Sequence, residues 1–182
     1  WYEDNKIALV LSTRATAIDR TERKVNLEHG GHLDYDALII ATGSRPRALP
    51  IEGSDLEHVY ALRGLADVER IRPQMVAGRS MVIVGAGYIG LEAAAVARQM
   101  GLTTSVLEMA PRVLARVTSP VMSEFYEDEH RRQGVEILTE TSLSRLEGKE
   151  GAVTSAILSD GTKLDADIVL VGIGILPNEE LA

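Results

Sequence analysis

The pattern of apolar and polar positions is most informative between residues 81 and 108. Four consecutive apolar residues, Met81 to Val84, are typical of a buried parallel strand. An alanine-rich, helix-favouring run follows over Leu91 to Met100, and a second β-branched and apolar run covers Thr103 to Leu107. The pattern therefore predicts a strand–helix–strand unit whose second strand ends at Glu108.

Shorter strands are predicted before this unit. Residues 15–19 and 24–28 alternate in the manner of half-buried antiparallel strands, with a turn at Gly30-Gly31 and another strand after it. Two further segments are apolar enough to predict strands of their own, Lys6 to Leu11 and Ala37 to Ala41. The first part of the chain is thus expected to be rich in strands.

Two helices are predicted outside the central unit. Residues 62–77 suit a helix that Pro73 should end or kink, because proline lacks an N–H and clashes with the preceding turn. The other helix has Ser119 as its candidate N-cap and Pro120 at its first position, and Gly134 ends it. Strands are expected after it over residues 135–138, 142–147, 152–158, 162–165 and 167–171.

An internal similarity links the two parts of the chain. Residues 160–174 repeat the order of features found in residues 30–43, namely a glycine turn, a short polar strand, an apolar strand and a closing glycine. The similarity predicts an α/β fold of two Rossmann-like dinucleotide-binding domains with parallel sheets and small antiparallel β-meanders. We expect the domains to cover residues 1–77 and 78–182, the first domain being incomplete.

The glycines of the central unit suit a dinucleotide. In Gly85-x-Gly87-x-x-Gly90, the first glycine permits a tight turn, the second lets a pyrophosphate approach the backbone, and the third lets helix and strand pack closely. The helix N-terminus would offer unpaired N–H groups to the phosphates. A turn that serves helix packing alone is the simpler interpretation, but the complete strand–turn–helix–strand context favours nucleotide binding.

Glu108 bears on which nucleotide binds. A carboxylate at the tip of the second strand can accept bonds from the ribose hydroxyls and repels a 2′-phosphate, which favours NAD(H) over NADP(H). Arg112 and Arg116 follow closely and could contact phosphate or adenine, which keeps NADP(H) open. A solvated surface is the simpler interpretation of either arginine.

Composition narrows the classes of function. A net charge of −8 argues against a nucleic-acid partner, and the absence of cysteine excludes a disulfide, a thiolate metal site or a redox dithiol within these residues. No apolar stretch reaches the roughly 20 residues of a membrane span, and no secretory signal is visible, so a cytoplasmic location is expected. Because Trp1 is not an initiator methionine, we expect a fragment of a longer protein.

These motifs resemble the flavoprotein family with two dinucleotide-binding domains, most closely the ferredoxin, rubredoxin and putidaredoxin reductases. The resemblance implies an enzyme that binds FAD and NAD, passes hydride from NADH to FAD, and then gives single electrons to a ferredoxin-type iron–sulfur protein. The matching stretches are Tyr35-Asp36-x-Leu38-x-x-Ala41-Thr42-Gly43-x-Arg45-Pro46-Arg47, Leu62-Arg63, Gly85-Ala86-Gly87-Tyr88-Ile89-Gly90-Leu91-Glu92, Pro111-Arg112-Val113-Leu114-x-Arg116, Phe125-Tyr126-x-x-x-His130-x-x-x-Gly134-Val135 and Gly172-Ile173-Gly174-x-x-Pro177-Asn178.

The resemblance also implies roles for individual residues. FAD would meet Ala15, Thr42, Gly43 and Arg63, although a core alanine and a surface arginine are the simpler interpretations of Ala15 and Arg63 from the residues alone. Glu92 would lie by the nicotinamide, with Tyr88 one turn earlier flanking that pocket, while a first-turn carboxylate favoured by the helix dipole is the alternative. The remaining expected nucleotide contacts are Gly85, Gly87, Ile89, Gly90, Glu108, Arg116, Gly172, Ile173 and Gly174.

Three functions stay open at this point. The leading one is an FAD-dependent NADH:ferredoxin-type reductase, and the second is a related NADH oxidase, peroxidase or disulfide reductase. The third is a non-catalytic NAD-binding module. The absence of cysteine in residues 78–182 argues against a thioredoxin-reductase layout, and the family's FAD-phosphate glycine turn and closing Gly-Asp motif are not among these residues.

Overall fold

The computed structural model describes residues 1–182 and divides into two compact units, residues 1–44 with 177–182 and residues 45–176. The first unit contains a three-stranded antiparallel meander in the order β1-β2-β3, as the alternating segments predicted. Asp19 accepts hydrogen bonds from two backbone N–H groups in the turn between the first two strands. The three strands are β1 (Ala15–Asp19), β2 (Lys24–Leu27) and β3 (His32–Asp34).

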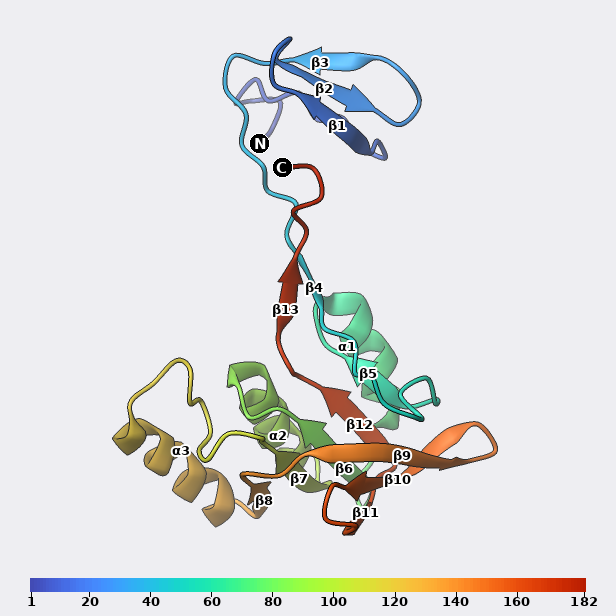
Figure 1. Ribbon diagram of the computed structural model, residues 1–182, viewed down its shortest axis with the longest axis vertical. Coiled ribbons are helices and arrows are strands. Elements are labelled where there is room, and N and C mark those ends of the chain that lie inside the picture. The colour runs from blue at the N-terminus through green and yellow to red at the C-terminus, as the bar shows by residue number, and fades with distance from the viewer. The chain divides into compact units, whose positions relative to one another are not determined.

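The second unit is built on a five-stranded parallel sheet in the order β5-β12-β6-β7-β8 (Figure 1). The last strand of this sheet along the chain, β12, is therefore inserted between the first two. The predicted strand–helix–strand unit is present as β6, α2 and β7. The strands are β5 (Val59–Ala61), β6 (Ser80–Val84), β7 (Thr103–Leu107), β8 (Val135–Leu138) and β12 (Ile168–Val171), and α2 covers Tyr88–Gln99.

Different layers cover the two faces of this sheet. Met81 and Ile83 of β6 pack with the helices, whereas Val82 and Val84 pack with the second antiparallel sheet, as alternation along a strand requires. All four side chains are buried, which explains the uninterrupted apolar run. The helices are α1 (Leu65–Ile71), α2 and α3 (Pro120–Arg132), and the second sheet contains β9 (Leu143–Lys149), β10 (Ala152–Leu158) and β11 (Lys163–Asp165).

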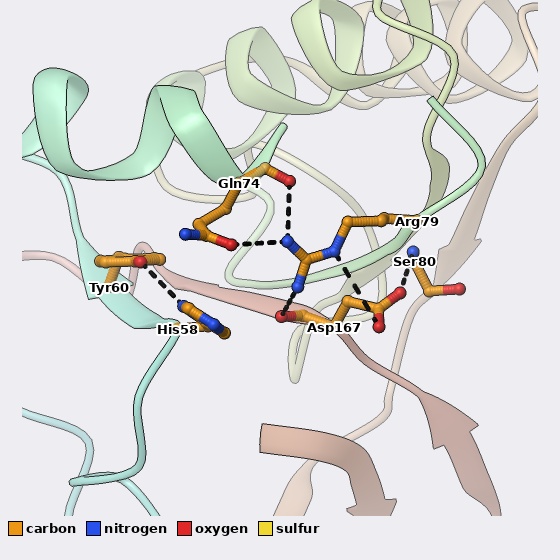
Figure 2. A network of polar contacts seen from close by, with 6 residues as sticks. All are labelled: His58, Tyr60, Gln74, Arg79, Ser80 and Asp167. Atoms are coloured by element: carbon orange, nitrogen blue, oxygen red, sulfur yellow. Dashed lines mark hydrogen bonds and ion pairs between the residues drawn. The ribbon is translucent and has the colours of Figure 1, made fainter. Parts of the chain in front are cut away.

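A polar network ties the amino ends of β6 and β12 together (Figure 2). Arg79 donates to the side-chain and main-chain oxygens of Gln74 and to the main-chain oxygen of Asp167. The Asp167 carboxylate accepts from the backbone N–H of Ser80 at 2.8 Å. These contacts fix the register of the two strands at the end of the sheet opposite the glycine turn.

Two predicted strands are absent. Residues 6–11 and 37–41 have no regular structure, and Ile39 is 90% exposed. The reason is that no strand lies beside either segment to complete its hydrogen bonds, since β1 and β2 pair only within their own meander. The predicted helix over 62–77 is shorter, as α1 passes into the 3₁₀ turn η1 (Arg72–Gln74) at Pro73, and a two-stranded sheet of β4 (Ser44–Pro46) and β13 (Ile175–Pro177) was not predicted.

The fold is mixed α/β with parallel and antiparallel sheets, as the sequence predicted. The compact units divide at residue 44 and not at residue 77, because β5 belongs to the same sheet as β6. The assignment of residues 1–77 to a partial FAD-binding domain and of residues 78–182 to an NAD(H)-binding domain stays a prediction. No helix has the length and apolar character needed to cross a membrane.

Candidate nucleotide-binding site

The turn between β6 and α2 explains two of its three glycines by contacts inside the fold. Gly85 has φ +105°, and a Cβ there would lie 2.5 Å from the Gly172 carbonyl oxygen. A Cβ on Gly90 would lie 2.1 Å from the carbonyl oxygen of Gly85, well inside van der Waals contact. Both positions need glycine for the turn to form and for α2 to pack on β6.

Gly87 has no such reason to be glycine. It is the N-cap of α2 with an extended backbone, φ −79° and ψ −178°, and a Cβ there would meet nothing within 4 Å. Its missing side chain leaves open space in front of the N-terminus of α2, where unpaired N–H groups favour an anion. The open side of Gly87 therefore fits the pyrophosphate of a dinucleotide.

Glu108 is bound to the backbone on both sides. Its Oε2 accepts a hydrogen bond from the Ala86 N–H at 2.9 Å, and its Oε1 accepts from the Ala110 N–H at 2.8 Å. The carboxylate thus joins the glycine turn to the segment after β7. Because each carboxylate oxygen has about two acceptor sites, one on each oxygen remains for a hydroxyl group.

A second glycine turn lies beside the first. The N–H of Gly172, directly after β12, donates to the Val84 carbonyl at 2.8 Å. The carboxyl ends of β6 and β12 are adjacent in the sheet, so Gly172 borders the turn that begins at Gly85. Ile173 is half-buried against the core, while Gly174 is exposed with φ +104°. Ligands of open α/β sheets bind at this edge.

The first turns of α2 present Tyr88, Ile89 and Glu92 to solvent. Tyr88 is 52% exposed and Ile89 47% exposed, and Glu92 is also exposed. Tyr88 and Glu92 are four residues apart in one helix and so share a face. They are available to a ligand that extends from the glycine turn along α2.

The two arginines after β7 differ in environment. Arg112 is half-buried and donates to main-chain oxygens of its own loop, which does not fit its predicted contact with a nucleotide. Arg116 is exposed, and no side-chain hydrogen bond or ion pair engages it. Only Arg116 is therefore available to a ligand without breaking contacts within the chain.

The residues expected near FAD fall in different units. Thr42 and Gly43 bind Asn178 in the first unit, through the Thr42 hydroxyl to the Asn178 main-chain oxygen and from the Asn178 N–H to Gly43 at 3.0 Å. Ala15 is half-buried in β1 of the same unit. Arg63 is exposed in the second unit. It precedes α1, and its backbone N–H donates to the Asp67 carboxylate in the first turn of that helix.

Three backbone N–H groups of the candidate site were not predicted from the sequence. The Ala86 and Ala110 N–H groups hold Glu108, and the Leu114 N–H donates to the Ala86 carbonyl at 3.0 Å. These contacts depend on where the backbone N–H groups point, and the residue types in the sequence do not reveal that direction. A hollow of about 470 Å³ lies elsewhere in the second unit, lined by residues 54–60 and by Arg70. The glycine turn is an open edge and not a closed cavity.

Comparison with known proteins gives one family and many relatives. The family model described as pyridine nucleotide-disulphide oxidoreductase matches residues 2–182. The chain is 44% identical to putidaredoxin reductase CamA of Pseudomonas putida over 186 residues and 37% identical to a rubredoxin-NAD(+) reductase of Pseudomonas putida over 182 residues. Both alignments cover 100% of this chain, but only 44% and 47% of the two relatives.

Solved structures agree with this result. The crystal structure of the covalent putidaredoxin reductase–putidaredoxin complex superposes with a TM-score of 0.92 and 44% identity, covering 99% of this chain and 44% of that chain. A NAD-dependent persulfide reductase from A. fulgidus superposes with a TM-score of 0.88 and 34% identity, covering 100% of this chain and 34% of that chain. The chain therefore spans less than half the length of the proteins that it resembles.

Proposed function

The chain belongs to the pyridine nucleotide-disulphide oxidoreductase family, and from this premise we propose that it forms part of an FAD-dependent NADH:ferredoxin-type reductase. The reductases of putidaredoxin and rubredoxin among its relatives support this choice of activity. A non-catalytic module is the less economical proposal, since the residues expected at the nicotinamide end are also present. A cytoplasmic location stays a prediction.

One observation carries the nucleotide part of this proposal. Gly87 is the only glycine of the turn that internal packing does not require, and its open side faces the space before the N-terminus of α2. A ligand that needs close approach to this backbone supplies the missing reason. The pyrophosphate of NADH would bind there, with the ribose hydroxyls at Glu108 and the nicotinamide toward Tyr88 and Glu92.

The protein's own contribution is binding and orientation. When bound, NADH would supply a hydride to the flavin, which would release electrons singly to an iron–sulfur partner. Glu108 would hold the adenosine end, the turn would hold the phosphates, and Tyr88 with Glu92 would orient the reacting ring. Thr42, Gly43, Ala15 and Arg63 would contact FAD. No residue is assigned to proton transfer, because hydride transfer between stacked rings needs none.

The activity is tested with the full-length protein. Mixing with NADH should bleach the flavin absorbance in a stopped-flow experiment, and an oxidised ferredoxin should restore it in one-electron steps. Failure of NADH to reduce the flavin would overturn the reductase proposal. Reoxidation by molecular oxygen or a disulfide, with no reaction toward ferredoxin, would favour the oxidase or disulfide-reductase alternative.

Replacing Glu108 by alanine should weaken NADH binding by about 1–3 kcal/mol, because a charged hydrogen-bonding partner is lost. Isothermal titration calorimetry measures this effect. Glu129→Ala, which removes a carboxylate from the surface of α3, is the matched control and should leave affinity unchanged. Tighter binding of NADPH than NADH by the unchanged protein would refute the assignment of Glu108.

Replacing Glu92 by alanine should slow flavin reduction more than it weakens binding of the adenosine end. The reason is that Glu92, one turn into α2, would touch only the reacting end of the nucleotide. Stopped-flow reduction rates and titration with ADP-ribose separate the two effects. Unchanged reduction kinetics would remove Glu92 from the site.

A further inference from the structure

We propose that Arg112 is a positioning residue for nucleotide binding, acting through Arg116. The inference rests on the proposed NADH site and adds how that site holds the adenosine diphosphate part of its ligand. Arg112 does not contact the ligand. It fixes the loop of residues 112–118 in the one conformation that presents the Arg116 side chain to the nucleotide.

The Arg112 guanidinium binds the loop on both sides of Arg116. One terminal nitrogen, Nη2, donates to the Ala115 carbonyl at 2.9 Å, and the other, Nη1, donates to the Thr118 carbonyl at 3.0 Å. These two carbonyls bracket residues 116 and 117 in the chain. The guanidinium therefore fixes the backbone immediately before Arg116 and two residues after it.

A buried hydroxyl anchors the guanidinium to α3. Arg112 Nη1 also donates to the Ser123 Oγ at 2.6 Å, and this hydroxyl donates in turn to the Val113 carbonyl at 2.6 Å. Ser123 is 1% exposed, so water does not compete for these bonds. The Val113 N–H donates to Glu127 of α3 at 3.1 Å. Both main-chain polar groups of Val113, its N–H and its carbonyl, are therefore bound to side chains of α3.

The middle of the loop is held to the glycine turn. Leu114 has φ +53°, an uncommon conformation for a leucine, and its N–H donates to the Ala86 carbonyl at 3.0 Å. Arg116 follows two residues later, within about 7 Å of backbone from that contact. An exposed arginine without a partner in the chain is therefore kept beside the turn where the phosphates of NADH would bind.

Arginine suits the position of residue 112 better than lysine. Its rigid, planar fork aims two nitrogens at acceptors in different directions, whereas a lysine ammonium is a single point on a flexible stem. The guanidinium reaches three acceptors at once, two carbonyls of the loop and the Ser123 hydroxyl of α3, which a single ammonium group could not do in the same geometry. Arg112→Lys keeps the charge and loses the geometry, which makes it the informative substitution.

The test is a double-mutant cycle on the full-length protein, with ADP-ribose as the probe, because it carries the adenosine diphosphate without the nicotinamide. Arg116→Ala should weaken ADP-ribose binding about tenfold, the loss typical of one charge-assisted hydrogen bond. Arg112→Lys should give a similar loss. The double variant should bind no more weakly than Arg116→Ala alone, because Arg112 acts through Arg116.

Two controls separate positioning from general damage. Arg132→Lys alters an exposed arginine of α3 paired with Glu129 and should leave ADP-ribose affinity unchanged. Flavin reduction by reduced nicotinamide mononucleotide, which donates a hydride but lacks the adenosine half, should proceed equally fast in Arg112→Lys and the unchanged protein. If Arg112→Lys fails to fold, Ser123→Ala removes one of the three acceptors and should show the same coupling to Arg116 with a smaller loss.

The outcomes are distinct. Losses from Arg112→Lys and Arg116→Ala that simply add, or an Arg112→Lys variant with unchanged ADP-ribose affinity, would overturn this inference and leave the proposed function in place. Absence of ADP-ribose binding by the unchanged protein would overturn the proposed function and the inference together.

Discussion

Replacing Gly87 by alanine is expected to weaken NADH binding about tenfold or more, equivalent to at least ~1.4 kcal/mol of binding free energy. The added methyl group would occupy the open space in front of α2, where the pyrophosphate must approach the backbone. The same methyl group meets no protein atom within 4 Å, so the fold should tolerate it. Stability should fall by less than about 1 kcal/mol, the usual scale for an N-cap change.

Calorimetric titration with NADH and a thermal melt measure the two quantities. Gly64→Ala is the matched control, since Gly64 is also a helix N-cap whose Cβ would meet open space. This control should leave NADH affinity unchanged. Full affinity in Gly87→Ala would show that no ligand approaches the turn at this residue, and the nucleotide site would have to lie elsewhere.

Gly90→Ala, the same chemical change three residues later, should have the opposite result. Its methyl carbon would lie 2.1 Å from the Gly85 carbonyl oxygen, which belongs to a tight turn and cannot yield as a flexible side chain would. Overpacking of this kind costs about 3 kcal/mol. At roughly 2–4 °C per kcal/mol for a domain of this size, Tm should fall by about 6–12 °C.

Circular dichroism melts of Gly87→Ala and Gly90→Ala, compared side by side, measure this contrast. A melting temperature for Gly90→Ala equal to that of the unchanged protein would mean that α2 can shift away from β6. The close packing at Gly90 would then not be what requires glycine there.

The β6–α2–β7 unit could be predicted from sequence because its signals are local. Met81 to Val84 are buried on both faces of the strand, which produces an uninterrupted apolar run. The helix is present as predicted but begins at Tyr88, three residues before the predicted start at Leu91. Each element is recognisable without knowledge of its neighbours. Strands were likewise expected over residues 142–147 and 152–158, and β9 and β10 are present there, with β9 extending to Lys149.

The segment from Ala37 to Ala41 shows where such reasoning fails. Its composition is that of a buried strand, yet Ile39 is 90% exposed and no strand pairs with it. A strand exists only where another strand accepts its hydrogen bonds, and apolar character does not supply that partner. The same reason applies to residues 6–11, whereas β4, Ser44–Pro46, has weak strand character and still pairs with β13.

In the candidate site, the sequence indicated candidate residues but not the main-chain contacts that hold them. Glu108 was expected to face a ribose, and the structure adds that both of its oxygens already hold backbone N–H groups of Ala86 and Ala110. Arg112 was expected among possible phosphate or adenine contacts, but its guanidinium donates to Ala115, Thr118 and Ser123 of the chain itself. Sequence spacing can place a charged residue near a site. The course of the backbone decides whether that side chain binds other groups of the protein or remains available to a ligand.

The position of β12 between β5 and β6 has a consequence for how the protein is made. During synthesis, β6, α2, β7, α3 and β8 emerge in order and can pair as neighbours, but β5 has no hydrogen-bonded neighbour in the sheet until residues 168–171 leave the ribosome. About a hundred residues separate β5 from β12, and closing so long a loop is slow. A nascent chain halted before Ile168 would therefore expose an unpaired edge of β6 and be most vulnerable to aggregation or to capture by chaperones at that stage.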